Sequence, residues 1–341
     1  MQHIAVLGAG SWGTALAIHL AQQGYEVRLW ARNPEHVDSL SSHRENRRYL
    51  PGIKLESTIV PTTELDWAVN SALAVVVAVP SHAVRQTVRS IKSMLKPQTV
   101  IINTAKGLEE NTLLRLSQVI AQEAGGLGEV AVLSGPSHAE EVSRFLPTAI
   151  VAASTKRKVA EFVQDLFMSP HFRVYTNPDV CGVEIGGALK NVIALATGIA
   201  DGLGFGDNTR AALMTRGLTE IARLGVSLKA EPLTFAGLTG IGDLIVTCSS
   251  MHSRNRRAGM QLGQGIPLEQ VLENMGMVVE GVKTTKAAMS LARKLGVEMP
   301  ITAEIYNVLF SGKEPLQSVT DLMQRQKTHE VEEVVHGSRI W

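Results

Sequence analysis

The sequence predicts an α/β fold, in which an N-terminal doubly wound domain is followed by an all-α C-terminal domain. Three observations support this prediction. Short runs rich in Val, Ile and Ala alternate with amphipathic helical patterns over the first half of the chain. A glycine-rich G-x-G-x-x-G motif directly follows the first of these runs. From residue 177 onward, nearly every apolar pattern has the period of a helix.

The first half contains seven short runs that we predict to be strands, at residues 3–8, 26–31, 72–80, 99–105, 129–135, 148–154 and 172–176. Continuous Val, Ile and Ala are typical of strands that helices cover on both faces. Between these runs, apolar periodicity predicts helices over residues 12–23, 82–94, 112–123 and 156–167. Strand–helix alternation favours a mainly parallel sheet.

The second half is predicted to be helical. Residues 186–204 and 208–226 form two long patterns rich in small residues, which let helices approach closely, and further helices are expected at 270–274, 283–295 and 302–310. We therefore divide the chain into a nucleotide-type domain, 1–176, and an all-helical substrate and catalytic domain, 177–341. The polar tail from Gln324 is expected to be loosely held.

Composition narrows the class of protein. The chain has 341 residues, 45% of them hydrophobic, and a net charge of +1, which provides no general field for nucleic acid or an anionic membrane. We see no signal peptide and no apolar run of the roughly 18 residues that a membrane span needs, so a soluble, cytoplasmic protein is expected. Cys181 and Cys248 lie far apart and outside any C-x-x-C, and no metal-ligand spacing is visible.

The glycine motif, Gly8, Gly10 and Gly13, has the context of a Rossmann-type dinucleotide site. A predicted strand precedes it, a helix follows it, and a second strand comes at the expected distance. The three glycines suit a tight turn, backbone access for a diphosphate, and close helix–strand packing. The helix N-terminus then offers free N–H groups to phosphate. A glycine-rich turn without a ligand is the alternative.

Residue 32 indicates which nicotinamide cofactor the site would take. An NAD-specific site usually has Asp or Glu at the end of the second strand, where it binds the ribose 2′-OH. This chain has Arg32, whose guanidinium can hold a 2′-phosphate, and this favours NADP(H) or tolerance of both cofactors. A solvated arginine is the alternative. A later arginine could assist: Arg44, Arg47 or Arg48.

Polar residues follow other predicted strands, where a doubly wound sheet places its ligands. Lys106 comes directly after one buried run, and Gly135 and Ser137 come after another. In the helical half, Lys190 and Asn191 interrupt an apolar helix. A lysine there must either extend to solvent or face a cavity, and burial favours the neutral amine that a general base needs.

Two further motifs in the helical half carry charge. Asp243 follows a glycine-rich turn, where a helix cap is the alternative reading, as it is for Glu280. The segment 249–259 clusters Arg254, Arg256 and Arg257 with Ser253 and Asn255. No aromatic residues are interleaved with these arginines, so the phosphate of a small substrate fits them better than nucleic acid.

Taken together, these motifs resemble one family. "GAGSWGTALA", "NTAKGLE", "SGPSHAEEV", "GGALKNVIAL", "GIGDL", "SRNRRAG" and "VVEG" occur in the order seen in the soluble NAD(P)-dependent glycerol-3-phosphate dehydrogenases of the bacterial biosynthetic type. The resemblance implies reversible hydride transfer between dihydroxyacetone phosphate and sn-glycerol 3-phosphate, which mainly supplies phospholipid synthesis. It also implies NADP(H) or NAD(H) as cofactor, no metal, and a homodimer.

The resemblance also assigns roles to residues. Lys190 would accept the proton in oxidation and donate it in reduction, Lys106 would help to polarise the carbonyl, and Asp243 would orient Lys190. The implied substrate-binding residues are Lys106, Gly135, Ser137, Lys190, Asn191, Asp243, Ser253, Arg254 and Asn255. The implied cofactor-binding residues are Gly8, Gly10, Ser11, Trp12, Gly13, Arg32, Lys106, Ala139, Arg254, Val278 and Glu280.

Three other readings remain open at this point. The first is a two-domain dehydrogenase that acts on a 3-hydroxyacid or a sugar acid. The second is a nicotinamide-binding sensor without turnover, although such a protein would be expected to lack Lys190 or Asp243. The third is a nucleic-acid binder that uses residues 254–257, against which the near-neutral net charge argues.

Overall fold

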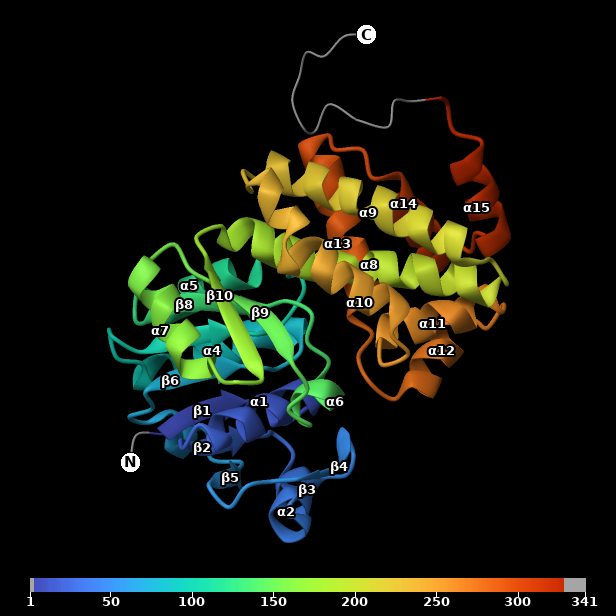
Figure 1. Cartoon of the computed structure of the whole chain (residues 1–341). Helices are drawn as coiled ribbons and strands as arrows, with labels where there is room; N and C mark the ends of the chain where they lie inside the picture. The colour runs from blue at the N-terminus through green and yellow to red at the C-terminus, as the bar shows by residue number, and fades with distance from the viewer. Residues whose placement is uncertain (1–2, 328–341) are drawn as a thin grey trace. The chain divides into compact units, whose positions relative to one another are not determined.

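The computed structural model describes residues 3–327, which form two compact units (Figure 1). In the described part of the chain, the first unit comprises residues 3–106 together with Arg115–Val180, and the second comprises Gly107–Leu114 together with residues 181–327. Residues 107–114, which we expected in the first domain, thus group with the helical unit. The proposed domain division after residue 176 stays a prediction. Residues 328–341 of the polar tail lie outside the described residues.

The first unit is built on an eight-stranded sheet with the order β10-β9-β8-β7-β6-β1-β2-β5. All neighbouring strands are parallel except β8 and β9. Every residue of β1, β6 and β7 is buried, as continuous apolar runs predict. The strands are β1 (His3–Leu7), β2 (Glu26–Trp30), β5 (Ile59–Thr62), β6 (Ala74–Val77), β7 (Val100–Asn103), β8 (Glu129–Ser134), β9 (Thr148–Ala153) and β10 (Phe172–Asn177).

Helices of the same unit pack on this sheet. They are α1 (Ser11–Gln22), α2 (Pro34–His43), α3 (Leu65–Val69), α4 (Val84–Ile91), α5 (Leu116–Ala124), α6 (Ala139–Val142) and α7 (Arg157–Phe167), with 3₁₀ turns at Ser81–Ala83 and Lys92–Met94. Helix α5 begins four residues later than predicted, because Leu113 has a left-handed backbone with φ of 60°. A two-stranded antiparallel sheet of β3 (Glu45–Asn46) and β4 (Leu50–Lys54) was not predicted.

The second unit is helical in its described part. It contains α8 (Val180–Gly202), α9 (Asp207–Ser227), α10 (Asp243–Ser249), α11 (Arg254–Gly263), α12 (Leu268–Met275), α13 (Glu280–Leu295), α14 (Pro300–Phe310) and α15 (Pro315–Met323). A 3₁₀ helix, Pro232–Ala236, and a π-helix, Leu238–Gly242, lead into α10. The predicted fold class, an α/β domain followed by helices, is confirmed (Figure 1).

Helix α8 is the core of the second unit. It is long and apolar enough to cross a membrane by length and composition, so our expectation that no segment qualifies was wrong. That expectation required an uninterrupted apolar run. Glu184 and Lys190 interrupt this helix, but its mean hydropathy remains high enough for a membrane span. In the structure, most of this helix is buried inside the second unit, as in the core helix of a soluble protein.

Small residues let α11 cross α8 at backbone contact. A Cβ added to Gly198 would lie 2.1 Å from the Arg256 carbonyl oxygen, and one added to Gly259 would lie 2.3 Å from the Leu195 carbonyl oxygen. Only glycine fits at such a crossing. The crossing holds the first turn of α11 against α8, which places the chain from Ser253 onward beside Asn191.

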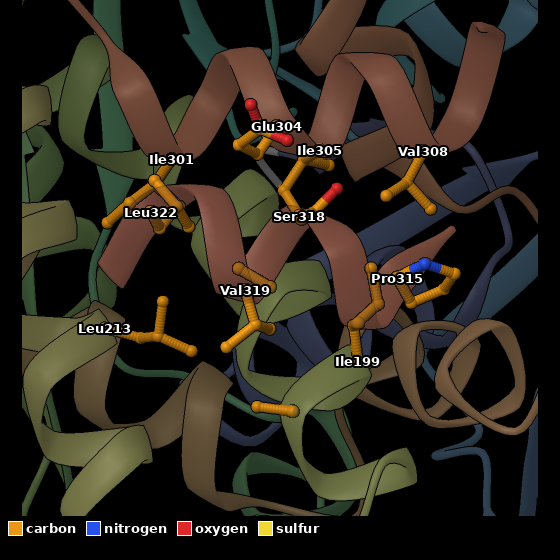
Figure 2. Close-up of a pocket in the computed structure, with 12 residues that line it drawn as sticks. Ile199, Leu213, Ile301, Glu304, Ile305, Val308, Pro315, Ser318, Val319 and Leu322 are labelled. Atoms are coloured by element: carbon orange, nitrogen blue, oxygen red, sulfur yellow. The ribbon is translucent and has the colours of Figure 1, made fainter. Parts of the chain in front are cut away.

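A small apolar cavity of about 30 Å³ lies between α8, α9, α14 and α15 (Figure 2). Aliphatic side chains of α14 and α15, among them Ile305 and Val319, face it from two sides. Ser318 also lines it, and the Ser318 hydroxyl is buried without a hydrogen-bond partner among the described residues. The lining is thus mainly apolar, and the Ser318 hydroxyl is one of its few polar groups.

Candidate active site

The glycine motif forms a tight turn between β1 and α1. Gly8 has φ of 118°, a conformation that favours glycine, and its amide donates to the Trp30 carbonyl oxygen at 2.9 Å. A Cβ added to Gly13 would lie 1.8 Å from the Gly8 carbonyl oxygen, so the helix packs directly on the turn. A Cβ added to Gly10 would meet no atom within 4 Å. The turn is therefore closed at its base and open in front of Gly10.

The N-terminus of α1 fits the diphosphate of a dinucleotide. Gly10 caps the helix without a side-chain hydrogen bond, and the first turn contains no acidic residue. The first amides of a helix have no intrahelical acceptor and carry a partial positive charge. Ser11 and Trp12, the first two helical residues, are half-buried. This arrangement could hold an anion in the open space in front of Gly10.

Arg32 lies two residues beyond the end of β2, and its side chain is exposed. No hydrogen bond or ion pair engages this guanidinium among residues 3–327. Arg44 differs, because its guanidinium donates to the carbonyl oxygens of Ile59 (2.9 Å) and Glu56. Arg44 thus supports the fold, and the suggestion that one of the three later arginines assists with a 2′-phosphate stays a prediction. Arg47 and Arg48 are exposed.

Two predicted site residues of the first unit converge on one carbonyl group. Lys106 follows β7, and its Nζ donates to the Gly135 carbonyl oxygen at 3.0 Å. The Ser137 hydroxyl donates to the same oxygen at 2.9 Å. Strands β7 and β8 are parallel neighbours, so their carboxyl ends meet at one edge of the sheet. Ala139 begins the short helix α6 and is buried.

In the second unit, Lys190 and Asp243 form a buried ion pair. Their side chains are 7% and 1% exposed. The Lys190 ammonium donates to Asp243 Oδ1 and, at 2.7 Å, to the Thr247 hydroxyl, which in turn donates to the Asp243 carbonyl oxygen at 2.6 Å. The Asp243 carboxylate favours the ammonium form of Lys190. This opposes burial, which favours the neutral amine.

Local structure explains how Asp243 reaches Lys190. The π-helix ends at Gly242, so Asp243 is the first residue of α10, and Thr247 follows one helical turn later. A Cβ added to Gly186 would lie 2.4 Å from the Thr239 carbonyl oxygen, so the π-helix packs directly on α8. Thr247 was not singled out from the sequence, although its i+4 spacing from Asp243 places both residues on one helix face.

The buried thiol of Cys248 adjoins this network. Desolvation raises the pKa of Cys248 to about 12, and a hydrogen bond with Thr197 only partly offsets this effect. The thiol therefore stays neutral near the ion pair. Cys181 is half-buried, and both cysteines are free.

The first turn of α11 carries the remaining predicted substrate residues. Ser253 caps the helix by accepting from the Arg256 amide at 3.2 Å. The Arg254 guanidinium donates to the Val278 carbonyl oxygen at 3.1 Å, which brings together two of the predicted cofactor residues. Asn255 is buried, and its Nδ2 donates to Asn191 Oδ1 at 2.9 Å.

Asn255 also accepts from the Gly281 amide at 2.9 Å and so caps α13. Glu280 is the first residue of α13, and Val279 occupies the cap position. The Glu280 carboxylate lies in the first turn, where the helix dipole favours negative charge.

The arginine cluster of α11 divides into different environments. The Arg256 guanidinium is buried, donates to Asp201 Oδ2 at 2.8 Å and to the Ser249 carbonyl oxygen at 2.6 Å, and so braces the helix. Arg257 is exposed. The three arginines of this cluster therefore do not share one environment, because successive helical residues point about 100° apart. The assignment of Arg254 to the substrate phosphate stays a prediction.

Among residues 3–327, no group of three or more His, Cys, Asp or Glu side chains is placed to hold a metal ion. Buried histidines serve the fold. His19, for example, is hydrogen-bonded to the Phe167 carbonyl oxygen at 2.8 Å, and burial lowers its pKa.

Comparison with known proteins gives consistent matches over both halves of the chain. The family model of the NAD-dependent glycerol-3-phosphate dehydrogenase N-terminus matches residues 3–160, and that of the C-terminus matches residues 179–320. Two curated relatives are named glycerol-3-phosphate dehydrogenase (NAD(P)+). The one from Moorella thermoacetica is 64% identical over 97% of this chain and 98% of its own. The one from Geobacillus kaustophilus is 55% identical over 98% of each.

A solved structure shows the same architecture. The crystal structure of glycerol-3-phosphate dehydrogenase from Coxiella burnetii matches with a TM-score of 0.92 and 40% sequence identity, and it covers 95% of this chain and 99% of its own.

Proposed function

The chain belongs to the NAD-dependent glycerol-3-phosphate dehydrogenase family, and on that premise we propose that it catalyses the reversible reduction of dihydroxyacetone phosphate to sn-glycerol 3-phosphate with Lys190 as proton donor and acceptor. As a member of this family, it is an NAD(P)-dependent oxidoreductase. The observation that carries the proposal is the buried network of Lys190, Asp243 and Thr247.

We assign cofactor binding to the turn at Gly8–Gly13 together with Arg32, because this turn is open in front of Gly10 and the guanidinium is exposed. When bound, the nicotinamide supplies the hydride for reduction and accepts it in oxidation. Ser11, Trp12, Ala139, Val278 and Glu280 belong to the same proposal.

Lys190 handles the proton. When the substrate ketone is reduced, negative charge develops on its oxygen, and an ammonium group stabilises that charge before it donates the proton from Nζ. In oxidation, the neutral amine accepts the hydroxyl proton. Asp243 and Thr247 hold Nζ in one position, so the proton moves along a defined direction, and the Asp243 carboxylate favours re-protonation of the amine between turnovers.

The substrate phosphate is assigned to Arg254, with Ser253 and Asn255 beside it. An arginine suits this task because its guanidinium binds phosphate oxygens in a fixed geometry. Binding energy at the phosphate, remote from the reacting carbon, then orients the ketone. Lys106, Gly135 and Ser137 are proposed to contact the substrate as well, with Lys106 polarising the carbonyl.

Loss of the Lys190 amine tests the proposal. Lys190→Ala should lower the rate of dihydroxyacetone phosphate reduction, followed by nicotinamide absorbance with NADPH and NADH in parallel, by at least about 10²-fold. Cofactor affinity, measured by calorimetry, should stay close to that of the wild type. Lys294→Ala removes an exposed lysine of α13 and is the matched control. Substantial activity of Lys190→Ala would exclude Lys190 from the catalytic role.

The wider setting is part of the same proposal. We assign the enzyme to the cytoplasm as a homodimer, without binding to nucleic acid or insertion in a membrane, where its product supplies glycerophospholipid synthesis. The near-neutral net charge supports the absence of nucleic acid. The small residues of α8 do not support a dimer interface, because Gly198 packs against α11 within the chain. Light scattering on the purified protein tests the dimer directly.

A further inference from the structure

We propose that His36 and Asn46 are positioning residues for the phosphate-binding turn, because together they hold the Ala9 carbonyl group and so aim the Gly10 amide at the cofactor diphosphate. The inference rests on the proposed cofactor site. It gives a role to the segment between β2 and β5, which the glycine motif alone does not explain.

The Ala9 carbonyl oxygen accepts two hydrogen bonds from side chains far along the chain. His36 Nε2 lies 3.0 Å from this oxygen, and Asn46 Nδ2 lies at the same distance. A carbonyl oxygen only accepts, so His36 Nε2 carries a proton. Both the neutral Nε2–H tautomer and the imidazolium ion can make this bond.

The geometry of the Ala9–Gly10 peptide determines where the Gly10 N–H group points. The described residues contain no cis peptide bonds, and in a trans peptide the C=O and the following N–H point to opposite sides of the chain. Since His36 and Asn46 occupy the carbonyl side of the Ala9–Gly10 peptide, the Gly10 N–H points away from them. A Cβ added to Gly10 meets no atom within 4 Å, so this glycine borders open space.

Asn46 is fixed in the orientation that this role needs. It is 1% exposed, its Oδ1 accepts from the Tyr49 amide at 3.1 Å, and its Nδ2 also donates to the Thr14 hydroxyl at 2.7 Å. Because Oδ1 is committed to Tyr49, Nδ2 faces Ala9. Thr14 belongs to the first turns of α1, so one amide ties the turn to its helix.

His36 is held by an aromatic neighbour. The Tyr49 ring meets the His36 ring edge-on, with centroids 5.2 Å apart and planes at 82°. His36 lies at the start of α2, where Asn33 accepts from the His36 amide at 3.0 Å. The backbone bond fixes the position of His36 at the start of α2, the Tyr49 ring limits the orientation of the imidazole, and Nε2 reaches the Ala9 carbonyl oxygen.

The test measures binding of two cofactor fragments by calorimetry, without turnover. ADP-ribose carries the diphosphate, whereas 2′-AMP does not. His36→Phe keeps the ring but removes the donor, and it should weaken ADP-ribose binding by about three- to tenfold, the usual net effect of one hydrogen bond. Binding of 2′-AMP should change less than about twofold. His36→Gln, whose amide can donate to the same carbonyl, should bind ADP-ribose nearly as the wild type does.

Two further variants complete the design. His43→Phe is the matched control, because His43 lies on the same helix, is exposed, and bonds to Ser39 instead. Asn46→Asp keeps the acceptor for Tyr49 but loses both donated bonds, so it should weaken ADP-ribose binding more than His36→Phe does. His36→Phe still tests the proposal where Asn46→Asp fails to fold.

The possible results distinguish a failure of the positioning role of His36 and Asn46 from a failure of the proposed cofactor site. Wild-type affinity of His36→Phe for ADP-ribose, or an equal loss for both fragments, would overturn the positioning role while leaving the cofactor site intact. Failure of the wild-type protein itself to bind ADP-ribose would overturn the cofactor assignment and the positioning role with it.

Discussion

Replacing Asp243 with Asn removes the charge that faces Lys190 but keeps an oxygen acceptor of similar size. Both side chains are less than a tenth exposed, so the ammonium left behind loses the carboxylate that it pairs with and has little water around it. Breaking such a buried pair costs about 3–5 kcal/mol. Lysine can avoid this cost by releasing its proton, which requires about 4–5 kcal/mol at pH 7 for an ordinary lysine. Because keeping the unpaired ammonium and releasing its proton cost similar amounts of free energy, part of the Lys190 population becomes the neutral amine.

The neutral amine cannot donate a proton to the reduced substrate. Asp243→Asn should therefore lower kcat/KM for dihydroxyacetone phosphate reduction by about 10²–10⁴-fold near pH 7, the rate equivalent of about 3–5 kcal/mol. The loss should grow with pH, because alkaline solution further depletes the ammonium.

The assay is steady-state reduction with a saturating cofactor from about pH 6 to pH 9, which spans the range in which a destabilised lysine titrates. Asp207→Asn is the matched control, because Asp207 is 93% exposed and pairs only with Arg210 among the described residues. A loss of activity that is the same at every pH would refute the reasoning, as would wild-type activity of Asp243→Asn.

Three further predictions concern the cofactor, the cavity and a buried acid. Arg32→Asp should shift the ratio of kcat/KM values from NADPH toward NADH, since a carboxylate repels a 2′-phosphate; an unchanged ratio would mean that the phosphate is held elsewhere. Ser318→Ala should raise the midpoint of urea denaturation, corresponding to about 1 kcal/mol, because it removes a buried hydroxyl without a partner among the described residues; a lower midpoint would contradict this. Burial raises the pKa of Glu220 from 4.5 to about 7, so its contribution to stability is complete below pH 4.5 and is lost as the pH rises through 7. Glu220→Gln should remove up to about 3 kcal/mol of that pH dependence from the unfolding free energy, and an unaltered profile would argue against the shift.

The strands at the centre of the sheet were predictable because their signal is local. β1, β6 and β7 are buried on both faces, and continuous Val, Ile and Ala can be recognised within a few residues. β5 and the β3–β4 pair were missed. β4 is half-exposed, and β5 contains a proline at the sheet edge, so neither has a clear apolar period.

The sequence pointed to some features of the candidate site and not to others. Lys190 and Asp243 stood out because charged residues in apolar or glycine-rich context are rare. Their pairing across 53 residues and the participation of Thr247 required the structure. The link from Asn46 to Ala9 was likewise invisible, since it joins a short strand to a turn 37 residues earlier.

By itself, the sequence determined the fold class, the dinucleotide-type turn and the family, because these depend on local patterns and on the order of motifs. Only the tertiary structure decided how each arginine of "SRNRRAG" is placed. Arg254 lies beside Val278, Arg256 is directed inward to Asp201, and Arg257 is exposed. Three identical charges within four positions look alike in a sequence. The helix points them in different directions, and a carboxylate 55 residues away holds one of them inside.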